Sequence, residues 1–233
     1  DHTLIACDAT ILWTEFLYEK KIVTDPIWRQ YDRDMVKSYA KGVLDIRDFC
    51  RKHSGAFRSI PEEKLHALAQ EFAKKKIAPL IFPDGKKWAK NALQANIPAC
   101  VLSASAAFIV KPIAKLFGLT DAMGIELAFK DGFCTGEIVG IPTFQEGKVE
   151  RLSERLAEAG IGFEDVLFFT DSRNDLPLAE RAGYTVCVNP DAVLESAARK
   201  NGWKVAEWKL SLRTQMTAQV DAKGVPETQT VRS

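Results

Sequence analysis

The sequence lacks the features of a membrane or exported protein. No apolar run approaches the roughly 20 residues that cross a bilayer, and the first residues have neither the basic start nor the apolar stretch of a signal peptide. The five cysteines include no C-x-x-C pair and are odd in number, so we expect neither a disulfide framework nor a zinc site. We therefore predict a cytoplasmic protein without a membrane partner.

An excess of one charge is also missing. The 233 residues carry a formal net charge of +1, with 46% hydrophobic and 27% charged residues. Because nucleic acids bind strongly basic surfaces, this balance makes a nucleic-acid partner unexpected. The chain has no internal repeat and no low-complexity tract. Its length suits one medium α/β domain, or a core domain carrying a smaller inserted one.

The first part of the chain, up to about Phe82, has a helical pattern. No convincing strand is visible between residues 11 and 79. Apolar residues recur there every three or four positions, which is typical of helices that pack on one face. They are Trp28, Tyr31, Met35 and Tyr39, followed by Leu65, Leu68 and Phe72.

From residue 84 onward, short apolar runs alternate with amphipathic helices, as in βαβ units. This pattern predicts an α/β fold with a parallel sheet and a helical insertion ahead of it. Strands are predicted at 99–102, 166–169, 184–188 and 203–208, with a hairpin of 125–129 and 133–139 that turns at Gly132. The last residues, 211–233, are predicted to form a polar tail.

The strongest chemical signal follows the strand predicted at 166–169. Asp171, Asn174 and Asp175 place two carboxylates and an amide directly after it, and such oxygens suit Mg²⁺. Asp171 could bind the ion directly, while Asn174 and Asp175 could orient its ligands or waters. The alternative is that these side chains only cap a helix beginning near Leu176.

Two further groups of polar residues also follow a predicted strand or begin a predicted helix. Ser103 and Ser105 follow the strand predicted at 99–102 and precede a helix, so a hydroxyl and free N–H groups could bind an anion there. Ser105 could instead merely cap that helix. Gly147 and Lys148 begin another helix, where Lys148 could bring a cation to a phosphate or could simply be solvated surface.

The order of Ser103, Lys148 and Asp171 with Asp175 resembles motifs two, three and four of the haloacid dehalogenase superfamily. In that family the first motif is D-x-D-x-T, and its first Asp attacks phosphorus. Two registers fit this chain. Either residues 6–10 are the motif and Ala6 replaces the nucleophile, or residues 1–4 are its last part and the nucleophile lies two residues upstream of Asp1.

We favour the second register, because the motif must follow a buried strand. In the first register that strand would be residues 1–5, which begin with three polar residues and are too short to anchor the motif. We therefore expect that a strand ahead of Asp1 is absent and that residues 1–233 alone are inactive. Further similarity to subfamily IB, the branch of phosphoserine phosphatase, lies in Trp13, 15–17, 81–83, Phe144, 146–148 and 189–191.

This resemblance implies a Rossmann-like core of residues 1–7 and 80–210, with residues 8–79 as an inserted helical cap of the C1 type. It implies a phosphomonoester hydrolase that works through an aspartyl phosphate. The implied Mg²⁺ ligands are the absent nucleophile and Asp1 with Asp171, supported by Asp175. Asp1 would also be the general acid and base. Thr3, Ser103 and Lys148 would bind the phosphoryl group, and Ser105 and Asn174 would contact substrate.

The substrate is predicted as a small phosphorylated metabolite. Asp8 lies where phosphoserine phosphatases carry an acidic residue that faces the substrate amine, although it could equally cap a helix. His53 lies near the position of their carboxylate-binding arginine, and a neutral histidine is a poor bidentate clamp. An amino alcohol phosphate such as histidinol phosphate therefore rivals phosphoserine. His53 and His66 could equally be helix-surface residues, and the whole protein could be a catalytically silent binder of phosphate ligands.

Overall fold

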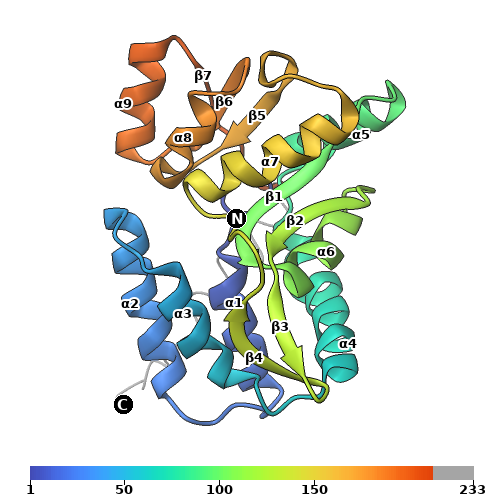
Figure 1. Ribbon diagram of the computed structural model, residues 1–233, viewed down its shortest axis with the longest axis vertical. Coiled ribbons are helices and arrows are strands. Elements are labelled where there is room, and N and C mark those ends of the chain that lie inside the picture. Colours follow the sequence, from blue (N-terminus) through green and yellow to red (C-terminus); the bar gives the residue numbers. More distant parts are fainter. Residues whose placement is uncertain (212–233) are drawn as a thin grey trace, which may run out of the picture.

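We describe the protein from a computed structural model in which residues 1–211 are described. The predicted polar tail, 211–233, therefore lies outside the described residues except for its first position. The described part is an α/β fold whose helices and parallel strands are shown in Figure 1. The predicted fold class is confirmed.

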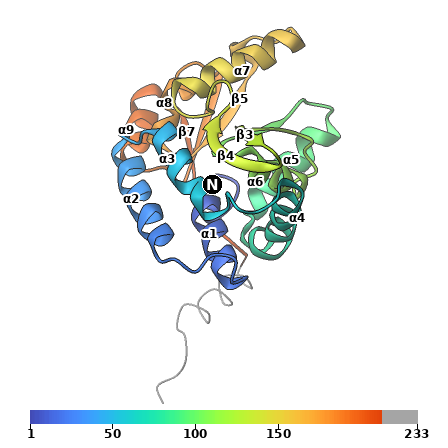
Figure 2. The same ribbon diagram turned by 60° about the horizontal axis from the view of Figure 1, so that its bottom comes forward.

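The first part of the chain is helical, as its apolar pattern predicts. Its helices are α1 (Ala9–Glu19), α2 (Ile27–Lys41), α3 (Ile46–His53) and α4 (Glu62–Phe72), followed by a π-helical turn (Ala73–Ile77) and a 3₁₀ turn (Ala78–Leu80). Figures 1 and 2 place α2 and α3 on one side of α1, and α4 with α6 on the other.

Strands and helices alternate in the second part. In chain order the elements are α5 (Pro83–Gln94), β1 (Cys100–Ala106), α6 (Ala107–Lys115), β2 (Asp121–Ile125), β3 (Leu127–Lys130), β4 (Phe133–Ile138), α7 (Glu146–Ala159), β5 (Leu167–Thr170), α8 (Leu176–Ala179), β6 (Tyr184–Val188), α9 (Ala192–Asn201) and β7 (Lys204–Ala206).

The parallel strands form two separate groups among the described residues. β1 pairs with β2, and β5 pairs with β6, which pairs with β7. β3 and β4 form the predicted antiparallel hairpin, in which Asp131 and Gly132 have φ angles of 51° and 79°. Two positive φ angles are what a type I′ turn requires, and glycine adopts one without steric cost.

Two strand predictions were wrong in detail. Ile125 ends β2 and does not begin the hairpin, and β2 itself was not predicted. β2 contains Ala122 and Gly124, which have little strand preference, and pairing with β1 places it in the sheet nonetheless. A side chain at Gly124 would lie 2.7 Å from the Cα of Ala107, so only glycine allows this close approach to α6.

The largest core joins the helical part to the sheet. The ring of Trp13 in α1 lies 5.4 Å from that of Phe72 in α4 and 5.6 Å from that of Phe108 in α6, both in edge-on geometry. Edge-on aromatic pairs add about 0.5–1.5 kcal/mol beyond the burial of their area. Because α1 and α4 share this core with α6, they are fixed to the sheet rather than packed only on one another. The boundary of the cap at residues 8–79 stays a prediction.

Candidate active site

Asp1 lies at the carboxyl end of β1 and is held there by hydrogen bonds. Its Oδ2 accepts from Ser105 Oγ at 2.9 Å, and its Oδ1 accepts from the backbone N–H of Ala9 at 3.0 Å. Ser105 is buried, and its hydroxyl also lies 3.2 Å from Thr10 Oγ1. Ser105 does not cap α6, because the residue at the cap position is Ala106, which makes no side-chain cap. The capping alternative for Ser105 is therefore wrong.

Asp171 and Thr3 meet at the end of β5. Thr3 Oγ1 donates to Asp171 Oδ1 at 2.5 Å. Burial raises the pKa of the Asp171 carboxyl, while the hydrogen bond from Thr3 acts in the opposite direction. Ser172 caps the following 3₁₀ turn by accepting from the backbone N–H of Asn174. Because Ser172 is the cap, the carboxylate of Asp171 can point toward Thr3.

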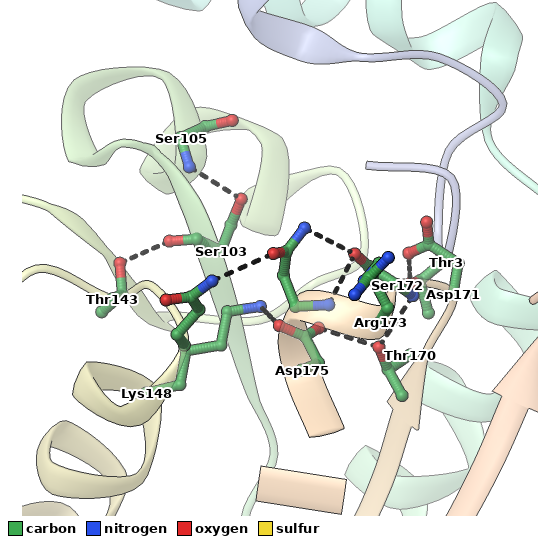
Figure 3. Close-up of polar contacts among 12 residues, drawn as sticks. Thr3, Ser103, Ser105, Thr143, Lys148, Thr170, Asp171, Ser172, Arg173 and Asp175 are labelled. Carbon is green, nitrogen blue, oxygen red and sulfur yellow. Dashed lines mark hydrogen bonds and ion pairs between the residues drawn. The ribbon is translucent and has the colours of Figure 1, made fainter. Parts of the chain in front are cut away.

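Lys148 and Asp175 form a buried ion pair. Lys148 Nζ lies 2.6 Å from Asp175 Oδ1, and their side chains are only 6% and 8% exposed. That oxygen has no conventional hydrogen bond, so the lysine charge is its compensation. Thr170 Oγ1 donates to the other oxygen, Asp175 Oδ2, at 2.8 Å. Figure 3 shows Lys148 extending from α7 to this carboxylate.

The start of α7 explains why Lys148 points inward. A Cβ atom on Gly147 would lie 2.0 Å from the carbonyl oxygen of Pro142, so only glycine lets this turn pack so closely. Gln145, just before the helix, has φ 48° and ψ −125°. A non-glycine residue there costs of order 1–3 kcal/mol and is typical of functional sites. The two features together position the lysine.

Ser103 is joined to the same site through its backbone and hydroxyl. Its Oγ accepts from the N–H of Ser105 at 3.2 Å, and its carbonyl accepts from Thr143 Oγ1 at 2.5 Å. Figure 3 shows these contacts beside Lys148 and Asp175. Ser103 thus lies between the residues at the end of β1 and those of α7.

Asn174 connects the site to α2. Its Nδ2 donates to the carbonyl of Tyr39 at 3.0 Å, and its Oδ1 accepts from Gln145 Nε2 at 3.2 Å. The same Nε2 lies 3.4 Å from the carbonyl of Gly42. Burial raises the pKa of the Tyr39 hydroxyl, and the nearby charge of Asp175 adds to the effect. Asn174 does not line the main cavity, but it lines a neighbouring cavity of about 410 Å³ together with Tyr39 and Asp171, and its contact with substrate stays a prediction.

One cavity of about 940 Å³ brings most of the predicted residues together. Its lining also includes apolar side chains from α2 and the loop that follows it. The predicted site residues among the lining are Asp1, Thr3, Asp8, Ser103, Ser105, Lys148, Asp171 and Asp175.

Asp8 lines the cavity, whereas His53 does not. Asp8 caps α1, because its Oδ1 accepts from the N–H groups of Thr10 and Ile11 at 2.9 and 3.0 Å, and it also lines the cavity. Both alternatives for Asp8 are therefore compatible with its position. His53 does not line the cavity and is buried, with Nε2 3.0 Å from Thr14 Oγ1. The helix-surface interpretation of His53 is wrong.

Sequence reasoning missed several residues that build the site. Tyr39 was assigned only to an apolar stripe, and Gln145 carries no motif, since its strained backbone is visible only in three dimensions. Thr170 and Ser172 are the sequence neighbours of Asp171 at the end of β5, and this adjacency is the sequence signal that could have pointed to their roles.

The carboxylate oxygens of the site suit a divalent cation. Within residues 1–211, no group of three or more His, Cys, Asp or Glu side chains is arranged to hold a metal ion. Asp171 is a partly buried carboxylate that lines the cavity together with Asp1, and carboxylate oxygens are ligands that Mg²⁺ prefers. Asp175 has both oxygens engaged by Lys148 and Thr170.

Comparison with known proteins identifies the family. Residues 1–180 match the haloacid dehalogenase-like hydrolase family. The chain belongs to this family. It is 34% identical over 213 residues, covering 90% of the chain and 96% of the relative, to a histidinol-phosphatase of Neisseria meningitidis serogroup C (strain 8013). It is 30% identical over 154 residues to phosphoserine phosphatase SerB1 of Mycobacterium tuberculosis (strain ATCC 25618 / H37Rv), covering 66% of the chain and 49% of the relative.

Solved structures share the fold. A protein of unknown function from Bordetella pertussis Tohama I superposes with a TM-score of 0.79 at 30% identity, covering 88% of this chain and 94% of that one. A phosphoserine phosphatase in a substrate-bound complex superposes with a TM-score of 0.65 at 21% identity, covering 94% of each chain.

In the described part of the chain, no helix is long and apolar enough to cross a membrane.

Proposed function

We propose that the protein is a Mg²⁺-dependent hydrolase of a small phosphomonoester that works through an aspartyl phosphate. The observation that carries this proposal is the convergence of Asp1, Ser105, Lys148 and Asp171 on one cavity at the carboxyl ends of β1 and β5. This is where parallel α/β sheets bind their ligands.

In the proposed mechanism the nucleophile is an aspartate two residues ahead of Asp1. Its carboxylate oxygen attacks phosphorus while the ester P–O bond breaks. Asp1, held by Ser105 and Ala9, donates its proton to the leaving alcohol. Asp1 then takes a proton from the water that attacks the aspartyl phosphate, which releases inorganic phosphate and restores the nucleophile.

Charge on the phosphoryl oxygens is stabilised by groups of this chain. Lys148, Ser103 and Thr3 line the cavity. The lysine ammonium and the two hydroxyls would stabilise the negative charge of the phosphoryl oxygens there. When bound, Mg²⁺ would supply Lewis-acid stabilisation of these oxygens, and the carboxylate of Asp171 and the carbonyl of Asp1 would hold it. Asp175 keeps Lys148 in place through the buried ion pair.

The cavity also favours one substrate class. The part of its wall formed by residues 8–49 contains Asp8, Tyr39 and apolar side chains such as Met35 and Phe49. Among the described lining residues between 8 and 49 there is no Lys, Arg or His. An amine is compatible with Asp8, whereas a substrate carboxylate would find no cation there. We therefore infer an amino alcohol phosphate, such as histidinol phosphate, in preference to phosphoserine.

The test uses a chain extended at its amino end by an apolar strand that finishes Asp-Leu before Asp1. We expect Mg²⁺-dependent phosphate release, with kcat/KM at least tenfold higher for histidinol phosphate than for phosphoserine. Replacing the added Asp by Asn should abolish release without unfolding the protein. Residues 1–233 alone should be inactive.

The second candidate is a silent binder of phosphate ligands, because Ser103, Lys148 and Asp171 line one cavity and could hold a phosphate there without cleaving an ester. If the folded, extended chain bound inorganic phosphate but hydrolysed no phosphomonoester, the binder would replace the hydrolase as the proposed function. Equal kcat/KM values for the two substrates would overturn the inferred substrate class.

A cytoplasmic location is also part of the proposal. All five cysteines are free thiols. Burial raises the pKa of the Cys7 and Cys50 thiols to about 12, which keeps them protonated and unreactive at neutral pH. Free thiols are typical of a reducing compartment.

A further inference from the structure

The segment that leads into α7 contacts two other parts of the candidate site. Thr143 Oγ1 donates to the carbonyl of Ser103 in β1, as Figure 3 shows. The ring of Phe144 lies 5.8 Å from that of Tyr39, near the end of α2. Thr143 and Phe144 are both buried. These contacts fix the start of α7, and with it the base of Lys148, relative to β1 and α2.

Gln145 adopts a backbone conformation that glycine normally supplies. Its φ of 48° and ψ of −125° are those of the first central residue of a type II′ turn. The N–H of Gly147 donates to the carbonyl of Phe144 at 3.0 Å, which is the hydrogen bond that closes such a turn. The N–H of Lys148 then donates to the carbonyl of Gln145 at 3.0 Å. The conformation of Gln145 therefore sets the direction in which α7 and Lys148 leave the turn.

The side chain of Gln145 makes contacts that glycine could not make. Its Nε2 donates to Asn174 Oδ1 at 3.2 Å and lies 3.4 Å from the carbonyl of Gly42. Asn174 is 3% exposed, and a buried amide oxygen that loses its donor is costly. Gly42 is the residue at which α2 ends. The amide of Gln145 therefore joins the end of α2 to the loop after β5.

Backbone strain and side-chain hydrogen bonding oppose each other at Gln145. Glycine would remove the strain of the positive φ angle, because it has no Cβ atom. It would also remove both contacts of Nε2, and Asn174 Oδ1 would lose this donor. The glutamine thus combines a strained turn with an anchor on two other elements. Strained backbone that its surroundings hold in one geometry is typical of functional sites.

We propose that Gln145 is a positioning residue for Lys148. Its amide, anchored on Asn174 and Gly42, holds the strained turn that directs the lysine toward the cavity and Asp175. Because one anchor belongs to α2 and the other to the loop after β5, the position of Lys148 depends on both. This inference rests on the proposed function in that Lys148 acts on the phosphoryl oxygens. The positioning itself requires neither metal nor substrate.

Two substitutions separate the turn from the amide. Gln145→Ala keeps the strained backbone and loses the amide, so the Tm should fall by about 4 °C. Gln145→Gly loses the amide but relieves the strain, so the Tm should stay within about 2 °C of that of the unmodified protein. In the extended chain, both variants should lower kcat for histidinol phosphate about tenfold, with a much smaller change in KM. A glycine variant with full kcat would overturn the proposal, because the turn alone would then position Lys148.

Lys21→Gly is the matched control for the relief of strain. Lys21 also has a positive φ angle, of 56°, and it is exposed just after α1. This variant should keep its Tm at or above that of the unmodified protein and its kcat within about twofold. If its kcat fell as far as that of Gln145→Gly, the loss at Gln145 would come from the glycine backbone rather than from the missing amide. That result would contradict the proposal.

A double-mutant cycle measures the positioning without turnover. In residues 1–233, Lys148→Met removes the cation of the buried pair with Asp175 and should lower the Tm. In the Gln145→Gly background the lysine is no longer held against Asp175. The fall in Tm caused by Lys148→Met should therefore be about half as large there, or less. Equal falls in the two backgrounds would overturn the proposal.

The kinetic and thermal measurements also distinguish this proposal from the proposed function. If the extended chain hydrolysed no phosphomonoester, the hydrolase would be overturned, while coupling between Gln145 and Lys148 in the cycle would still support the positioning. If the extended chain were active and the changes in Tm were additive, the positioning would be overturned and the hydrolase would stand.

Discussion

Asn174 donates a hydrogen bond from Nδ2 to the backbone carbonyl of Tyr39 at 3.0 Å, and this bond ties the end of α2 to the loop after β5. Gln145 extends the connection by donating to Asn174 Oδ1 and contacting the carbonyl of Gly42. The helical segment that carries Asp8 and Tyr39 is thereby linked to the turn that follows Asp171. The end of α2 is therefore held to the rest of the site by the side chains of Asn174 and Gln145.

Removing this link should affect substrate binding more than the chemical step. In the extended chain, we expect Asn174→Ala to raise KM about 5- to 30-fold, because the partly buried carbonyl of Tyr39 loses its donor at a cost of about 1–2 kcal/mol, with a smaller change in kcat. Steady-state kinetics on histidinol phosphate would measure both. Asn201→Ala is the control, because Asn201 Nδ2 also donates to a backbone carbonyl at 3.0 Å, on the exposed end of α9. A fall in kcat alone would assign Asn174 to the chemistry instead.

Lys148 should be a major determinant of stability, separate from any role toward phosphate. We expect Lys148→Met to lower the free energy of unfolding by about 3–5 kcal/mol, because it leaves the buried carboxylate of Asp175 without its cation. Lys148→Met combined with Asp175→Asn should recover much of that loss. Urea unfolding of residues 1–233 would measure both.

The control for this pair is Lys111→Met, because Lys111 lies 2.8 Å from Glu126 in an ion pair whose side chains are 52% and 40% exposed. An exposed pair contributes at most about 1 kcal/mol. If Lys148→Met were no more destabilising than Lys111→Met, the buried pair would not stabilise the fold.

The sequence predicts those parts of the fold and the site whose residues lie in a recognisable local pattern along the chain. Asp171, Lys148 and Ser105 were found because each follows a strand or begins a helix, and parallel strands bring such ends to one edge. The contacts of Tyr39 and Gln145 join elements more than a hundred residues apart and leave no periodic pattern. β2 was missed for a similar reason, since its pairing with β1 outweighs its weak strand preference.

His53 should stabilise the packing of α2 against α3 without contributing to specificity. Its Nε2 lies 3.3 Å from Asp32 Oδ1, and both side chains are almost fully buried. Because the oxygens of Asp32 have no hydrogen bond among the described residues, His53→Ala should leave that carboxylate isolated and lower the free energy of unfolding by about 2–4 kcal/mol. His66→Ala is the control, since His66 lies 3.7 Å from Glu62 with both side chains about half exposed. A selective rise in KM with unchanged stability would instead place His53 in the substrate site.

Thiol labelling should report on access to Cys100 through the cavity. Burial raises the pKa of the Cys100 thiol to about 11, so about one molecule in a thousand carries the reactive thiolate at pH 8. Because the thiolate is the nucleophile, the rate of disulfide exchange with a small aromatic disulfide should rise about tenfold per pH unit up to about pH 10. Cys100 lines the cavity and is partly buried, whereas Cys187 in β6 is fully buried and does not line it. Burial also raises the pKa of the Cys187 thiol to about 11, so the two thiols differ in access rather than in their fraction of thiolate. Cys100 should therefore be labelled at least tenfold faster than Cys187, and peptide mass mapping would follow each site. Equal labelling rates at both cysteines would show that the cavity gives the reagent no access to Cys100.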